Sequence, residues 1–158
     1  MGILNIDKST LAEIIEKSRI SSRKRACHIV RSFKQGIPAV MFNALQPGTY
    51  IRPHIHPVAE GTEILIPITG KSTAIIFDEK GKIKEKYELS KEKTNYLEIP
   101  SRTFHTVIAL EPDSILCEIY MATHPEEEYK QFAAWSPEEG PLADEYLKKL
   151  IKEISKKR

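Results

Sequence analysis

The sequence predicts a mainly β fold, a sandwich or closed barrel, with one helix before it and one after it. Eight short apolar segments follow one another at roughly ten-residue spacing between residues 38 and 121. Turn sequences rich in Gly, Pro and Asp separate these segments, and both ends of the chain carry apolar residues at helical spacing. Many short strands joined by turns are typical of all-β folds rather than of alternating α/β folds.

The first element is a helix over residues 7–19, where Leu11, Ile14 and Ile15 fall on one face. A polar, basic connector at residues 21–25 follows it. The strands are then expected at residues 39–45, 50–56, 63–68, 72–77, 83–89, 96–99, 105–110 and 114–120. Turns such as Pro47-Gly48 separate them, because Pro fixes one backbone dihedral and Gly supplies a positive φ.

The second helix is expected over residues 141–157, with Leu147, Leu150 and Ile154 on one side and lysines on the other. Lysine late in a helix complements the macrodipole, so we interpret this basic end as a solvated helix face. One domain is predicted, made of an N-terminal helix and connector (1–37), a β-barrel (38–121), and an irregular segment with the C-terminal helix (122–158). The single tryptophan, Trp135, is expected to pin the irregular segment to the rest of the molecule.

The composition, the N-terminal residues and the cysteine spacing argue against several classes of protein. The 158 residues include 24 basic and 22 acidic side chains, a formal charge of +2, which argues against a dedicated nucleic-acid binder. No apolar run is long enough to span a membrane, and charges interrupt the N-terminus where a signal peptide would be apolar. Cys27 and Cys117 lie far apart without a CxxC motif, so no disulfide framework is expected. We expect a cytoplasmic protein that binds neither nucleic acid nor membrane.

The histidines point to a metal site. His54 and His56 are two residues apart in a predicted strand, so both imidazoles project from the same face. Glu63 opens the next strand, and His105 comes 42 residues later. Three imidazoles and one carboxylate suit a divalent transition metal (Zn, Fe, Mn, Ni or Cu) and argue against calcium. His28 and His124 are interpreted as packed or surface residues.

Strand parity extends this site toward a ligand. Tyr50 and Arg52 share the face of His54 and His56 if the strand is regular. Tyr50 is then a candidate general acid or hydrogen-bond donor. Arg52 would either clamp a carboxylate or phosphate, or form an ion pair with a neighbouring acid.

The spacing of Gly48, His54-x-His56, Glu63 and Gly70 resembles the first sequence motif of the cupin superfamily, and residues 100–105 resemble the second. More closely, residues 43–54, 77–78, 100–110 and 132–140 are similar to WbuC-type cupin-fold metalloproteins. The resemblance covers about residues 25–140. It implies a single-domain double-stranded β-helix (jelly-roll) barrel with one metal, a small-molecule ligand and a homodimer. Members of that family often belong to polysaccharide or O-antigen biosynthesis loci.

Three positions depart from the cupin pattern. Six residues separate His56 from Glu63, more than the usual three or four, so Glu60 is a rival metal ligand. Glu63 is preferred because the six-residue step to Gly70 matches the motif and so fixes the strand register. Arg102 stands where the motif has Gly, which disfavours a tight positive-φ turn and puts a cation near the metal. Ala109 replaces a common Asn at a position that is not a ligand.

Three functions fit these residues. The first is a metal-dependent cupin acting on a small anionic or sugar-derived molecule, with Arg52 and Arg102 holding an anionic group. The second is an iron-dependent dioxygenase, since four protein ligands leave two positions free in a six-coordinate site. The third is a non-enzymatic module in which the metal helps to fix a ligand or the barrel.

Overall fold

The computed structural model describes residues 5–32, 37–57, 61–121 and 130–156. Helix α1 (Lys8–Ile20) comes first and α2 (Pro141–Ile154) last, with ten strands between them. The strands are β1 (Arg25–Arg31), β2 (Ala39–Leu45), β3 (His54–Ile55), β4 (Thr62–Thr69), β5 (Ser72–Phe77), β6 (Ile83–Leu89), β7 (Leu97–Pro100), β8 (His105–Ala109), β9 (Ser114–Met121) and β10 (Gln131–Phe132). The mainly β prediction with a helix at each end is confirmed.

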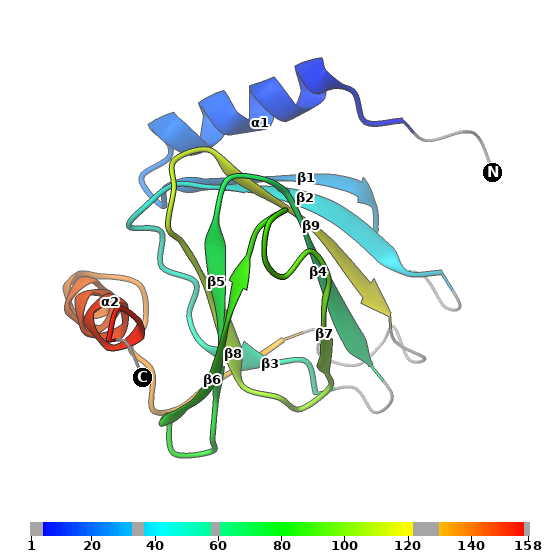
Figure 1. Cartoon of the computed structure of the whole chain (residues 1–158). Helices are drawn as coiled ribbons and strands as arrows, with labels where there is room; N and C mark the ends of the chain where they lie inside the picture. Colours follow the sequence, from blue (N-terminus) through cyan, green and yellow to red (C-terminus); the bar gives the residue numbers. More distant parts are fainter. Residues whose placement is uncertain (1–4, 33–36, 58–60, 122–129, 157–158) are drawn as a thin grey trace.

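Within the described residues the strands form two antiparallel five-stranded sheets. One has the order β1-β2-β9-β4-β7 and the other β10-β3-β8-β5-β6. The sheets face each other as a jelly-roll sandwich, and α1 lies across the outside of the first (Figure 1). The core between them contains Leu45, Leu65, Ala74, Leu89 and Leu116, all almost fully buried.

Each helix covers the outer face of one sheet. On the β1-β2-β9 side, Ile14 of α1 packs against Ala44 and Ile115. On the β5-β8 side, Leu147 and other α2 residues pack against Ile75, which is completely buried. The terminal helices therefore explain why strands such as β5 are apolar on both faces. Neither described helix is long and apolar enough to cross a lipid bilayer.

The structure corrects two sequence predictions, one in each sheet. Residues 25–31, where no strand was predicted, form β1 and pair with β2 along its length. The polar side chains of Arg25, His28 and Arg31 obscure the alternation of apolar and polar residues that predicts a strand. In the structure, Ala26 and His28 face α1, and Arg25 faces the barrel interior. The predicted strand over residues 50–56 shrinks to the two residues of β3, and the short β10 that pairs with it was not predicted.

Trp135 fixes the segment before α2 to the barrel. Its half-buried ring lies 5.1 Å from the Phe77 ring and 5.7 Å from the Phe104 ring, centroid to centroid. The ring also lies directly against Gly81, in the turn between β5 and β6. Trp135 lies in the segment that joins β10 to α2, so this contact positions the part of the chain that borders the cavity described below.

Candidate metal centre

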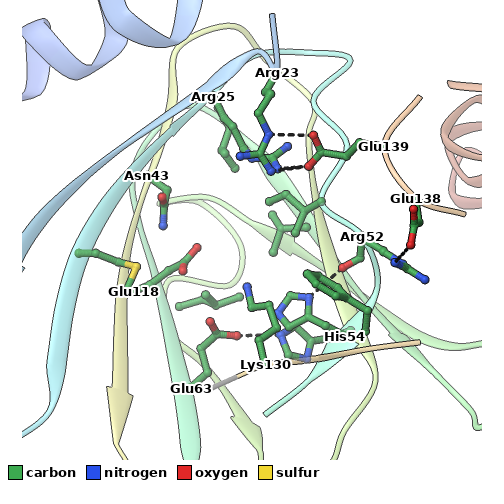
Figure 2. Close-up of a pocket in the computed structure, with 17 residues that line it drawn as sticks. Arg23, Arg25, Asn43, Arg52, His54, Glu63, Glu118, Lys130, Glu138 and Glu139 are labelled. Carbon is green, nitrogen blue, oxygen red and sulfur yellow. Dashed lines mark hydrogen bonds and ion pairs between the residues drawn. The ribbon is translucent and has the colours of Figure 1, made fainter. Parts of the chain in front are cut away.

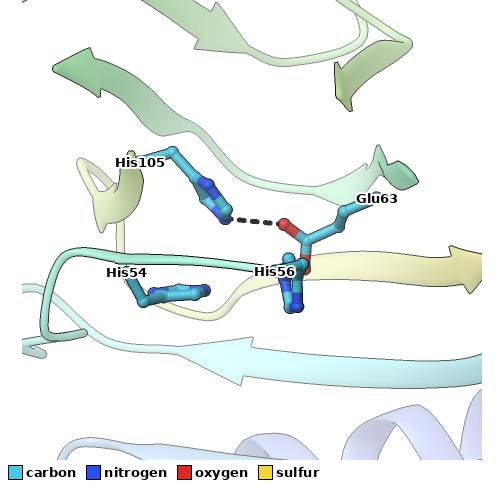
Figure 3. A group of neighbouring side chains, drawn as sticks. All are labelled: His54, His56, Glu63 and His105. Atoms are coloured by element: carbon cyan, nitrogen blue, oxygen red, sulfur yellow. Dashed lines mark ion pairs between the residues drawn. The ribbon is translucent and has the colours of Figure 1, made fainter. Parts of the chain in front are cut away.

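The four predicted metal-binding side chains lie together inside the barrel. His54 is in β3 and His56 follows it, Glu63 lies near the start of β4, and His105 opens β8. Because β3 pairs with β8, His54 lies opposite His105, and their ring centroids are 4.4 Å apart. All four side chains are buried, with exposures of 2–4%. Their ligand atoms lie within 4.8 Å of one another (Figure 3).

Backbone hydrogen bonds orient two of the rings. Nδ1 of His54 lies 2.9 Å from the carbonyl oxygen of Arg52, and Nδ1 of His105 lies 2.8 Å from that of Thr103. A carbonyl oxygen only accepts, so each Nδ1 carries the proton and donates it. In the neutral His54 ring this leaves Nε2 unprotonated and able to bind a metal. Nε2 of His105 lies 2.8 Å from Glu63 Oε2.

The charge states also fit a metal. Burial, followed by the neighbouring His105, holds the pKa of His54 well below its ordinary value, so that ring is neutral at pH 7. Burial alone would raise the pKa of Glu63, but His105 and His56 outweigh it and hold the pKa of this carboxyl well below its usual range. Neutral imidazoles and an ionised carboxylate are the forms that bind metal ions.

If the cluster fits a metal ion, a buried nitrogen or oxygen atom that could bind the ion should lack a hydrogen-bond partner. Nε2 of His54 is buried and has no hydrogen-bond partner among the residues that the structure describes. Leaving such an atom unsatisfied costs about 1–3 kcal/mol, which a metal ion would offset. Metal–ligand bonds of about 2.0–2.2 Å place opposite ligands about 4.0–4.4 Å apart, so the present spacing needs only a small contraction.

Glu63, rather than another carboxylate of the described chain, supplies the acidic member of this cluster. It lies on the inner face of β4 with Leu65, as the register inferred from Gly70 predicted. The rival Glu60 and the unrelated His124 lie outside the described residues.

The cluster opens into a cavity of about 420 Å³ (Figure 2). His54, Glu63 and His105 border one end, and Arg23 and Arg25 lie at the other. Its charged lining consists of four cations and four carboxylates: Arg23, Arg25, Arg52, Lys130, Glu63, Glu118, Glu138 and Glu139. A divalent metal would therefore make the cavity net positive.

Comparisons with known proteins give the family and the fold of the chain. A family model described as a domain of unknown function, DUF6016, matches residues 6–89, more than half of the chain. The chain belongs to the DUF6016 family. A comparison with curated proteins finds no match.

Solved structures give the fold of this DUF6016 protein. The capsular polysaccharide assembling protein CapF from Staphylococcus aureus is similar with a TM-score of 0.57 and 15% identity, over 82% of this chain and 33% of that one. KdgF from Halomonas sp. is similar with a TM-score of 0.50 and 22% identity, over 65% and 82%. An oxalate oxidase in complex with glycolate has a TM-score of 0.54 and 15% identity, over 70% and 57%. At these identities the likeness shows the cupin fold alone, and the chain spans only a third of CapF.

Arg52 is the one predicted ligand-holding residue that borders the cavity in this DUF6016 protein. Its Nη1 lies 3.3 Å from Glu138, its Nε lies 3.3 Å from Ser136 Oγ, and its guanidinium lies over the Phe132 ring at 5.1 Å. The Glu138 side chain is 86% exposed, so this ion pair is weak and easily exchanged for a ligand. The structure thus shows the second alternative considered for Arg52, the ion pair with a neighbouring acid.

The structure does not bring Tyr50 or Arg102 to the cavity that the histidines border. Tyr50 lies beneath α2, donates its hydroxyl to the carbonyl oxygen of Pro137, and has its pKa raised to about 12 by burial. Parity fails because residues 49–53 are not a regular strand. Arg102 is exposed, with its Nε 3.3 Å from the carbonyl oxygen of Pro57. Its φ of +60° shows that the cupin turn is kept although Gly is missing.

Several cavity residues were not found from the sequence. Arg23 and Arg25 were assigned to a connector, whereas the structure places both on one carboxylate, that of Glu139. Glu118 lies on the inner face of β9, and the signal was present as an acid between the buried Leu116 and Tyr120. Lys130 and Phe132 reach the cavity only because β10 pairs with β3, a long-range contact that local sequence does not show.

Proposed function

We propose that this protein is a metal-binding cupin that acts on a small anionic or sugar-derived molecule. The buried cluster of three histidines and Glu63, opening into a cavity with cations on its walls, is the observation that carries the proposal. A divalent transition metal bound there would polarise an oxygen atom of the ligand. The metal would be zinc, iron, manganese or nickel, the ions that such a mixed nitrogen and oxygen set prefers.

The protein's own side chains would bind and orient the ligand. Arg52 offers a guanidinium whose present partner, Glu138, is largely in water. Phe132 lies beside the cluster, with its ring 6.4 Å from that of His54, and is half exposed. An exposed aromatic ring next to charged and amide groups can pack against the apolar face of a sugar.

The finer assignment follows the resemblance. We place the protein with the WbuC-type cupins and a role in polysaccharide or O-antigen biosynthesis, supported by the matching segments and, at the level of fold only, by the likeness to CapF. A homodimer is part of this proposal. Its support is that β1, β7, β10 and β6 are the outermost strands of the two sheets in the described chain, and unpaired edges favour association.

Anion binding tests the proposal. Isothermal titration of phosphate and of citrate into the zinc-loaded protein should show binding to the wild type. Arg52→Leu should weaken it by about 1–2 kcal/mol, roughly 5–30-fold, because a charge-assisted hydrogen bond is lost while only a weak ion pair had to be exchanged for it. Zinc content should not change.

Arg102→Leu is the matched control, since it removes the same charge from a residue outside the cavity. It should bind both anions as the wild type does. Equal affinities of the wild type and Arg52→Leu would exclude Arg52 from the ligand site. Oxygen uptake by the iron-loaded protein in the presence of such an anion would instead favour a dioxygenase.

A further inference from the structure

Glu118 is a carboxylate of the cavity lining that does not belong to the metal-type cluster. It lies on β9, opposite Met41 on β2 and Leu65 on β4. Its neighbours at alternate positions, Leu116 and Tyr120, are buried, so Glu118 occupies an inward-facing position of an otherwise apolar face. Figure 2 shows its carboxylate turned into the cavity, below Asn43 and on the side of Glu63.

The surroundings of Glu118 hold its carboxyl group without neutralising it. The Asn43 side chain makes a hydrogen bond with it. The charged or titratable groups that face it are Glu63 from β4, His105 from β8, Lys130 from the segment before β10, and Cys27 from β1. Burial, followed by the charge of Glu63, raises the pKa of Glu118 to about 7.

A contribution to the stability of the fold does not explain why a glutamate occupies position 118. An acid at an inward-facing position costs desolvation energy, and the Asn43 amide and the charge of Lys130 offset only part of it, since the pKa of Glu118 stays raised. A Leu or Met of similar size would pack against Met41 and Leu65 without that cost. Carboxyl groups kept in such places, beside a metal-type cluster and open to a cavity, are typical of reacting groups.

We propose that Glu118 is the acid–base residue of the cavity and exchanges a proton with a ligand held at the histidine cluster. This rests on the proposed function. As a base, the carboxylate accepts a proton from a hydroxyl or acidic C–H of the ligand. An O–H bond forms on Glu118, and the electron pair of the broken bond stays on the ligand. As an acid it returns the proton by the reverse step. Asn43 positions the carboxyl group during both steps.

The ligand class follows from this chemistry. The metal cluster and the cations take an anionic oxygen donor, while Glu118 needs an exchangeable proton beside it. A hydroxy acid, a keto acid or a sugar acid carries both groups within a few bonds. Glycolate is the simplest probe, because its carboxyl group stays ionised and its hydroxyl stays protonated at neutral pH.

The proposal is tested by measuring how many protons the protein takes up when it binds glycolate. The zinc-loaded protein is titrated calorimetrically at about pH 7 in two buffers of different ionisation enthalpy, which gives the protons taken up per ligand. An anion beside Glu118 raises its affinity for a proton, so the wild type should take up a fraction of a proton. In Glu118→Gln this uptake should fall at least about fivefold. Glu92→Gln, which changes an exposed carboxylate outside the cavity, should keep the wild-type value.

The outcomes separate the two proposals. If the wild type binds neither zinc nor another transition metal, the metal-binding function itself is wrong and Glu118 has no such role. If zinc and glycolate bind but proton uptake is equal in wild type and Glu118→Gln, the function stands and the role of Glu118 is refuted. Should that variant not fold, the wild type alone decides: no proton uptake on glycolate binding at any pH between about 5 and 8.5 would overturn the proposal.

Discussion

Gly81 and Trp135 together test how the cavity-bordering segment is held. Gly81 has φ of +83°, and a Cβ added there would lie 2.7 Å from Cε3 and 2.8 Å from Cδ2 of Trp135. Gly81→Ala should therefore cost about 1–2 kcal/mol for the left-handed backbone and about 1–3 kcal/mol for displacing the indole ring. The total, roughly 2–5 kcal/mol, corresponds to a fall in melting temperature of roughly 4–20 °C for a chain of this size.

A double-mutant cycle followed by thermal or urea unfolding isolates the contact. Trp135→Ala alone should cost about 2–4 kcal/mol, below the range for a fully buried ring because Trp135 is half-buried. In that background Gly81→Ala should cost only the backbone part. Gly140→Ala is the control, since Gly140 has φ of +145° but nothing within 4 Å of an added Cβ, and its cost should not depend on Trp135. Strict additivity of Gly81→Ala and Trp135→Ala would refute the packing described here.

Two further predictions concern single residues. Arg102→Gly should raise the free energy of unfolding by up to about 1 kcal/mol, because φ of +60° costs an Arg more than a Gly; an unchanged or lower urea midpoint would contradict it. Glu118→Gln should change the pH dependence of unfolding in the metal-free protein. The pKa of Glu118, raised from 4.5 to about 7 by burial, means that its contribution is fully present below about pH 4.5 and is lost as the pH rises through 7. The variant should therefore gain stability relative to the wild type between pH 5 and 8, and parallel profiles would show that the carboxyl group is not perturbed.

The sequence predicted most of the barrel because local patterns determine most of its strands. β2, β5 and β6 begin and end at the predicted residues, since turns containing Pro47, Gly48, Gly70 and Gly81 bound them. The metal-type cluster was predictable for a related reason. Two-residue spacing placed His54 and His56 together, and the step from Glu63 to Gly70 gave the register of β4.

Features that depend on long-range pairing were not predictable. β3 and β10 are two residues each and exist because they pair with each other across the chain. Tyr50 was assigned to the cavity by strand parity, but parity holds only inside a regular strand, and its hydroxyl is instead bound to Pro137. Arg25 appeared to belong to a basic connector, whereas the structure directs it inward from β1 to Glu139 and to the carbonyl oxygen of Tyr50.

Metal content measures the central claim most directly. The protein is dialysed against zinc and then against metal-free buffer, and bound zinc is determined by elemental analysis. The wild type should retain about one ion per chain, and His105→Ala should retain almost none, because one nitrogen donor and the partner of Glu63 are lost together. His28→Ala, which removes a histidine on the α1 side of the sheet, should retain the wild-type amount. A wild type without zinc or any other transition metal, or equal retention by His105→Ala, would contradict the account.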